Sequence, residues 1–195
     1  MGRPNRILVD NGIYHILNRG HNRYRIFNSL HDYKVYMAAI RRYREEFEFD
    51  LFHYCLMPNH IHLLIRIHNG AELPRLMQAI TQSYAKYYKK QYKLIGNLFQ
   101  GRYKSSYIDK DEYLLECGRY IERNPLRARM VADLSEYYFS SYSFYVNGKK
   151  DDIITTDPLY EALSPDPAIC RQRYKEYILQ ERLYERMIDK GFKIS

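Results

Sequence analysis

The sequence predicts an α+β fold in the order βαββαβ, followed by a further helix and a helical tail. Residues 60–67 carry Ile or Leu on one face and His60, His62 and Arg66 on the other, the period of two that is typical of a half-buried strand. Residues 32–47 and 72–92 repeat apolar positions at spacings of three and four, as amphipathic helices do. With 195 residues, 46% of them hydrophobic, the chain can bury an ordinary core.

Turn residues separate the predicted elements. The expected strands span residues 13–17, 51–57, 60–67 and 102–108, and the expected helices span residues 32–47, 72–92 and 111–124. The first strand closes at Gly20, Pro58 and Asn59 turn the second strand into the third, and Gly96 and Gly101 lie in the loop before the fourth. The second and third strands therefore form a hairpin.

This order is that of the ferredoxin-like arrangement, a four-stranded antiparallel sheet with two helices on one face. The first and third strands lie at the centre of such a sheet. We therefore expect His60 and His62 near mid-sheet, on the face that the two helices leave open.

The pattern of the chain changes near residue 133. We divide it into a main domain, residues 1–132, and an accessory C-terminal extension, residues 133–195. The extension begins with a Tyr- and Ser-rich stretch. A last helix is expected from Pro167 to about Asp189, because Asp166 is a favourable N-cap and Pro167 suits the first helical turn.

Composition limits the kind of partner and the location. No apolar run approaches the ~18 residues that span a bilayer, and the first residues lack the apolar core of a secretion signal, so we expect a cytoplasmic protein without a membrane partner. The formal net charge of +8 points to a polyanionic partner.

The pair His60 and His62 is a candidate metal site. Side chains two apart on a strand project to the same side, and two imidazoles leave further coordination positions for substrate and water. Imidazole suits Mn²⁺ or Zn²⁺ better than Mg²⁺, which would need additional oxygen ligands. The alternative is that both imidazoles only form hydrogen bonds on a solvated face of the sheet.

The helix after the fourth strand carries Tyr120 and Asn124 as i, i+4 neighbours. A phenol and an amide oxygen placed in this way can reach one metal-bound phosphate, and Tyr is a known covalent nucleophile. Core packing explains Tyr120 equally well. Asn124 precedes Pro125, so it is also a candidate cap of the following short helix.

A long basic stretch indicates binding of nucleic acid. No Asp or Glu occurs from Leu73 to Ile108, whereas Lys and Arg are frequent and interleaved with Tyr, as expected of a groove that follows a phosphate backbone. The candidate DNA-binding residues are Arg19, Arg23, Lys86, Lys89, Lys90, Lys93, Arg102, Lys104, Arg119 and Arg123.

Two segments resemble one protein family. YCLMPNHIHLLI, residues 54–65, resembles the HUH motif of the Y1 transposases, which are IS200-like. Residues 98–131, with RYIERNP around Tyr120, are similar to the nucleophile region of the REP-associated tyrosine transposase branch, and YHILNRG, residues 14–20, resembles that branch as well. The similarity runs through residues 2–131 and continues weakly in the tail.

The resemblance implies a single-stranded DNA endonuclease and strand transferase acting at hairpin or repetitive extragenic palindromic DNA. His60 and His62 would bind Mg²⁺ or Mn²⁺, and Tyr120 would form a 5′-phosphotyrosine link. Asn124 stands where IS200-type relatives have a Gln that binds the metal, which makes it the candidate third ligand. The relatives leave both a homodimer and a monomer open.

Two other functions fit parts of the same pattern. A non-catalytic module that binds single-stranded nucleic acid on its sheet would show binding without metal and without cleavage. A metal-dependent hydrolase with water as its nucleophile would cleave DNA without a protein adduct.

Overall fold

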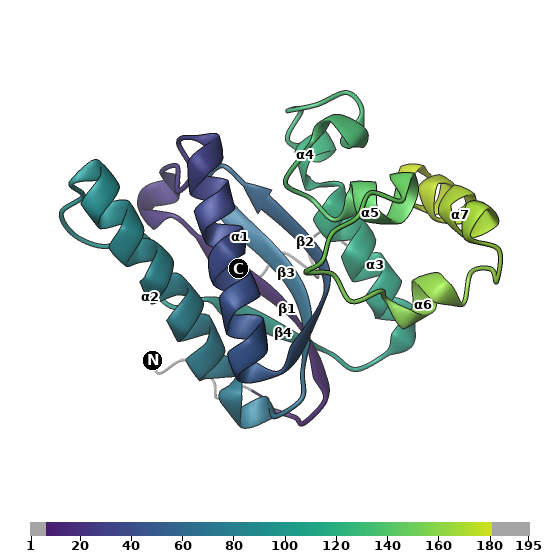
Figure 1. Cartoon of the computed structure of the whole chain (residues 1–195), viewed down its shortest axis with the longest axis horizontal. Coiled ribbons are helices and arrows are strands. Elements are labelled where there is room, and N and C mark those ends of the chain that lie inside the picture. Colours follow the sequence, from purple (N-terminus) through teal and green to yellow (C-terminus); the bar gives the residue numbers. More distant parts are fainter. Residues whose placement is uncertain (1–6, 181–195) are drawn as a thin grey trace.

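The computed structural model describes residues 7–180 and confirms the predicted α+β fold (Figure 1). The strands are β1 (Gly12–Arg19), β2 (Phe49–Met57), β3 (His60–Ile67) and β4 (Lys104–Ile108). They form one antiparallel sheet in the order β2-β3-β1-β4, so β1 and β3 are central as predicted. The strand β4 begins two residues later than the sequence pattern indicated.

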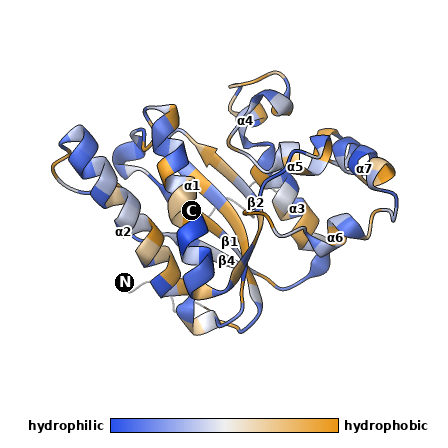
Figure 2. Ribbon diagram, viewed as in Figure 1, coloured by the Kyte–Doolittle hydropathy of each residue, from blue (hydrophilic) through white to orange (hydrophobic). Residues whose placement is uncertain are grey.

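Helices cover both faces of this sheet. They are α1 (Leu30–Phe47), α2 (Leu73–Tyr92), α3 (Asp111–Glu122), α4 (Asn124–Arg127), α5 (Tyr142–Asn147), α6 (Pro158–Glu161) and α7 (Pro167–Leu179), with short 3-10 turns at His21–Arg23, Gly70–Glu72 and Leu134–Glu136. The pair α1 and α2 lies across one face (Figure 1). Figure 2 shows that hydrophobic residues concentrate in the sheet, while the C-terminal end of α2 is hydrophilic.

Asp32 joins the first two helices. Its carboxylate accepts hydrogen bonds from the backbone amide of Ser29, which completes a capping box at the start of α1. The same carboxylate accepts hydrogen bonds from the hydroxyls of Tyr87 and Tyr92 on α2. These two tyrosines of the basic stretch therefore serve the packing of α2 against α1.

The second face of the sheet is not open, contrary to the expectation from the sequence. Helix α3 packs on it, and its side chains form a second core with residues of β2 and β3, including Phe52, Cys55 and Leu64. Gly118 permits this close approach, because a Cβ there would lie 2.8 Å from Nε2 of His53. The nucleophile candidate on α3 is thus brought directly against the sheet.

The C-terminal extension, as far as residue 180, packs against the main domain and shares its core. It runs along the edge strand β2, where the Leu56 amide donates to the Phe139 carbonyl and the Thr155 amide donates to the Leu51 carbonyl. Side chains of the extension, such as Tyr145 and Tyr174, are buried in the main core. The contacts protect the edge of the sheet from pairing with other chains.

Helix α7 begins at Pro167, with Asp166 as its N-cap, as the sequence predicts. It ends at Leu179, and the predicted continuation over residues 181–189 lies outside the described residues. Across residues 7–180, none of the helices combines the length and the apolar character that a bilayer crossing requires.

Candidate active site

His60 and His62 lie at the start of β3 and face α3. Their rings are 5.0 Å apart and nearly perpendicular. The turn before β3 holds the first ring, because Oδ1 of Asn59 lies 2.6 Å from Nδ1 of His60. His60 is half-buried, whereas His62 is only 2% exposed because α3 covers it.

Both rings are held in the neutral state. Burial lowers the pKa of His60 to about 4, with a further decrease from the charge of Arg19 and an opposing hydrogen bond from Asn124. Burial also lowers the pKa of His62 well below its ordinary value, and His15, His60 and Arg127 lower it further. A neutral imidazole retains the lone pair that a metal requires.

A third histidine, which the sequence analysis did not single out, completes this cluster. His15 on β1 lies fully buried with its Nε2 2.9 Å from Nδ1 of His62. The two rings are nearly parallel, with centroids 5.1 Å apart. A signal was available in the sequence, because β1 neighbours β3 in the predicted sheet and His15 is a polar residue within an apolar run.

Tyr120 lies beside these imidazoles. Its ring is 5.7 Å from the ring of His62 and 5.8 Å from that of His15, and it meets both edge-on. The side chain is 8% exposed. The guanidinium of Arg127 on α4 lies 4.8 Å from the centre of the Tyr120 ring, which places a positive charge next to the phenol.

Asn124 connects the end of α3 to His60. Its amide nitrogen donates to the backbone carbonyls of Tyr120 and Ile121. Its side chain also forms a hydrogen bond with His60 that raises the pKa of that ring, as an accepting amide oxygen does. The N-cap of α4 is Arg123, without a side-chain hydrogen bond, so Asn124 does not serve as the cap considered from the sequence.

The donor set fits a divalent metal. Nδ1 of His60 faces Asn59, Nδ1 of His62 faces His15, and the Asn124 side chain lies within hydrogen-bond reach of His60. Two nitrogens and one oxygen leave positions for phosphate and water, as catalytic metal sites do. Within the part of the chain that is described, no three His, Cys, Asp or Glu side chains gather as a metal cage. The candidate protein ligands of a metal here are therefore the two imidazoles and the amide oxygen of Asn124.

Two of the predicted DNA-binding residues are directed into the protein. Arg119 and Arg123 are 4% and 7% exposed. Arg119 donates to the carbonyls of Tyr177 and Gln180, and Arg123 donates to that of Ile178. The guanidinium groups therefore bind the negative end of the α7 dipole and attach α7 to α3.

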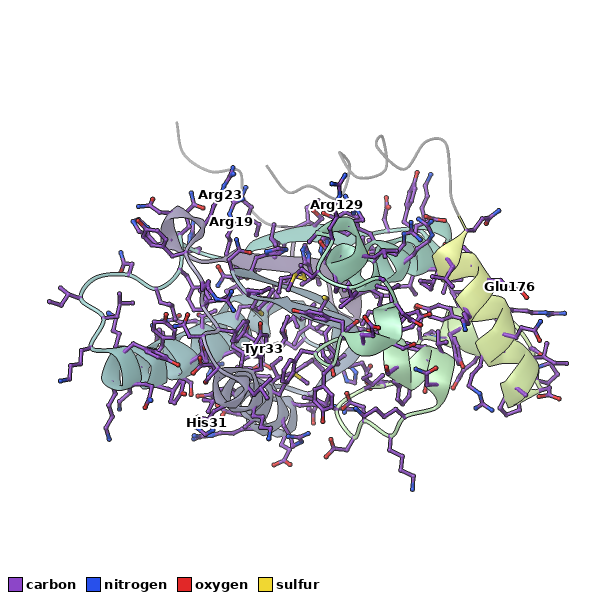
Figure 3. The ribbon with its side chains drawn as sticks, turned by 90° about the horizontal axis from the view of Figure 1, so that it is seen from above. Arg19, Arg23, His31, Tyr33, Arg129 and Glu176 are labelled. Carbon is purple, nitrogen blue, oxygen red and sulfur yellow. The ribbon has the colours of Figure 1, made fainter. Side chains whose placement is uncertain are left out.

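The other predicted DNA-binding residues lie toward solvent. Arg23, Lys86, Lys89, Lys90, Lys93 and Arg102 are exposed, and Arg19 and Lys104 are half-buried. Arg19, Arg23 and Arg129 lie on the side of the molecule away from His31 and Tyr33 of α1 (Figure 3). This is the side on which His60 and Arg19 face each other across β3 and β1.

A groove of about 580 Å³ runs between α2 and the segment before β4. Its lining contains amide and basic side chains but no carboxylate; among these residues are Asn18, Gln78, Gln82, Lys89, Asn97 and Arg102. The 97–101 segment of its wall is tied to the end of β1, since the Gln100 amide donates to the Arg19 carbonyl. The groove thus begins at the end of the sheet that carries His60.

The tyrosines of the basic stretch contribute little exposed ring surface. Tyr84, Tyr88 and Tyr103 are buried. Of the tyrosines in this stretch, Tyr107 and Tyr92 are exposed, by 37% and 36%. Stacking of bases on a series of tyrosines, which the composition indicated, is therefore not a feature of α2.

Comparison with known proteins agrees with this geometry. A model of the family described as IS200-like transposases matches residues 8–124, which contain both histidines, Tyr120 and Asn124. The chain belongs to the IS200-like transposase family. The resemblance inferred from the HUH-like segment and the Tyr120 region is confirmed.

One solved structure shows the fold of this transposase as well. A REP-associated tyrosine transposase bound to a REP hairpin superimposes with a TM-score of 0.66 at 18% identity, over 80% of this chain and 93% of that chain. A candidate transposase from Deinococcus radiodurans R1 matches at 17% identity and a TM-score of 0.43, over 63% of this chain and 95% of that one. No curated protein sequence matches the chain.

Proposed function

We propose that this transposase cleaves and rejoins single-stranded DNA through a covalent bond to Tyr120. The observation that carries the proposal is the contact of Tyr120 with His62 of the histidine pair, with ring centres 5.7 Å apart. A nucleophile and a metal-binding pair at this separation can act on the same phosphodiester. All of these groups come from one chain, so we expect a monomer to contain a complete site.

His60 and His62 would bind Mg²⁺ or Mn²⁺, with the amide oxygen of Asn124 as the third protein ligand. A bound divalent cation supplies charge neutralisation at the non-bridging oxygens of the scissile phosphate. Mn²⁺ suits the two imidazole nitrogens better than Mg²⁺ does. We therefore expect higher activity with Mn²⁺.

The protein groups carry out the displacement. The Tyr120 hydroxyl loses its proton to solvent, its oxygen attacks phosphorus, and the bond from phosphorus to the 3′ oxygen breaks. The departing 3′ oxygen takes up a proton, which leaves a free 3′-hydroxyl and a 5′-phosphotyrosine. The guanidinium of Arg127, 4.8 Å from the ring centre, places a positive charge beside the ring that would carry the negative charge of the nucleophile. Because the phosphate ester is conserved, a new 3′-hydroxyl can reverse the step and join the strands.

The DNA would lie along the basic surface around this site. Arg19 pairs with His60 across β1 and β3, and the carbonyl of Arg23 accepts a hydrogen bond from Asn59, which precedes His60. Lys89 and Arg102 line the groove beside α2. Phosphate contacts by such residues give affinity without sequence preference, and amides such as those of Gln78 and Gln82 can bind base edges. The REP hairpin bound by the structural relative makes a hairpin with a single-stranded flank the preferred test substrate.

A denaturing gel tests the proposal. Hairpin DNA with a single-stranded flank, labelled at its 5′ or 3′ end, is incubated with Mn²⁺, Mg²⁺ or EDTA. We expect an SDS-resistant adduct on the 5′-phosphate side that requires metal and is absent in Tyr120→Phe. Cleavage without an adduct would instead favour a hydrolase, and tight binding without cleavage would favour a non-catalytic binding module.

A further inference from the structure

We infer that His15 is a positioning residue that fixes the ring orientation and tautomer of His62 for metal binding. The inference rests on the proposed function, because it concerns the metal ligand of that site. We assign His15 a role in positioning His62, not in binding the metal.

Sheet geometry brings the two rings together. On β1 and β3, Leu17 pairs with His62 and His15 pairs with Leu64, so His15 is the diagonal neighbour of His62 on the same face. Both side chains are buried, the distance from Nε2 of His15 to Nδ1 of His62 is 2.9 Å, and the rings are inclined by only 15°. Rotation of the His62 ring would break this hydrogen bond.

The hydrogen bond also selects a tautomer. Between two neutral imidazoles one nitrogen donates and the other accepts. If Nδ1 of His62 donates to Nε2 of His15, Nε2 of His62 keeps its lone pair for a metal. In the opposite arrangement the only hydrogen of His62 is on Nε2, which excludes coordination there. Partners of this kind commonly orient metal-bound histidines.

Packing alone does not require an imidazole at this position. Leu64 pairs with His15 across the sheet, and the buried side chains on this side of the sheet, such as Cys55, Cys117 and Ile121, are mostly apolar. A Phe or Leu side chain would suit such surroundings without burying polar atoms. His15 also contacts Tyr120 edge-on at 5.8 Å. One buried imidazole therefore contacts both the metal-ligand candidate and the nucleophile candidate.

The test uses His15→Phe, which removes the acceptor, and His15→Gln, which retains one. In ¹⁵N-labelled protein without metal, we expect wild-type His62 to carry its hydrogen on Nδ1 and the Phe variant to show a mixture of both tautomers. Titration calorimetry with MnCl₂ should show affinity about 10- to 100-fold weaker for His15→Phe, with most of the loss recovered in His15→Gln.

Exposed His68 provides a matched control, since His68→Gln should leave both measurements unchanged. Melting temperature and hairpin affinity in EDTA check that each variant is folded. A His15→Phe protein with wild-type Mn²⁺ affinity and an unchanged His62 tautomer would overturn the inference. If wild-type protein binds no Mn²⁺, the proposed function fails, while the tautomer of His62 still decides the role of His15.

Discussion

The carboxylate of Glu122 lies 2.9 Å from Nδ1 of His53, and neither side chain is exposed to solvent. The other ring nitrogen of His53 lies 3.1 Å from Asp157. Glu122 also accepts hydrogen bonds from Ser141 and Tyr174. This cluster joins β2, α3 and the C-terminal extension two residues beyond Tyr120, so it holds the end of the helix that carries the nucleophile candidate.

The buried cluster should make stability depend on pH. Burial alone would lower the pKa of His53, but the hydrogen bonds that its ring donates to the carboxylates of Asp157 and Glu122, together with their negative charges, raise it to about 9. Its stabilisation is fully present below the unfolded pKa of about 6.5 and is lost as the pH rises through about 9. We expect the free energy of unfolding in urea to fall by an amount on the order of 3 kcal/mol between these values.

His53→Gln should flatten that pH dependence, because the neutral amide does not titrate. The exposed His68→Gln should retain the wild-type slope. A wild-type protein with constant stability between pH 6.5 and 9 would show that His53 is not protonated in the cluster.

Arg119 and Arg123 should stabilise the folded protein. Each is buried and donates to carbonyls at the end of α7. Replacing either residue with Ala should lower the free energy of unfolding by about 2 to 3 kcal/mol, since hydrogen bonds from a charged group are lost. Arg102→Ala, at an exposed position, should change it by less than about 0.5 kcal/mol. If the Ala variants instead keep wild-type stability and bind DNA more weakly, Arg119 and Arg123 contact DNA, as the sequence predicts.

Lys89 and Arg102 should act on DNA affinity instead. Both line the groove beside α2 and both are exposed. Fluorescence anisotropy with a labelled hairpin over a range of KCl concentrations should show weaker binding for each Ala variant. The slope of log affinity against log salt should fall by about 0.7 to 1 per residue. Lys34→Ala, at an exposed position on α1, is the matched control. An equal loss of affinity in this variant would show that the DNA does not bind specifically along the groove beside α2.

Asn124 should contribute to metal binding through its amide oxygen. Asn124→Ala removes that oxygen and the hydrogen bonds to the Tyr120 and Ile121 carbonyls, so Mn²⁺ affinity should fall by about 10-fold. Asn124→Asp keeps an oxygen at the same distance and should retain most of the affinity. Calorimetry with MnCl₂ measures both, with Asn147→Ala as control. Wild-type affinity in the Ala variant would remove Asn124 from the ligand set.

The sheet and its central histidine pair were predictable because they follow from local patterns. Alternation in residues 60–67 places His60 and His62 on one face, and the element order makes β3 central. The cover provided by α3 was not predictable in the same way. It depends on Gly118, whose missing side chain permits the close approach to His53, and a single Gly gives no periodic signal.

The partners of the site could be predicted only in part. His15 lies 47 positions from His62 in the sequence, so only the strand order connects them. Charge alone did not distinguish Arg119 and Arg123, which bind the carbonyls of α7, from the exposed cations of α2. The Tyr-rich extension showed no clear period, although Tyr174 and Asp157 reach the core that supports α3.

The most direct test is the site of covalent attachment. The transposase is incubated with Mn²⁺ and hairpin DNA, the DNA is digested to a short nucleotide remnant, and tryptic peptides are sequenced by mass spectrometry. We predict a 5′-phosphonucleotide on the peptide Tyr120–Arg123, attached to Tyr120, and no modified peptide in EDTA. Attachment to any other side chain, or complete cleavage with every peptide unmodified, would contradict the assignment of Tyr120 as the nucleophile.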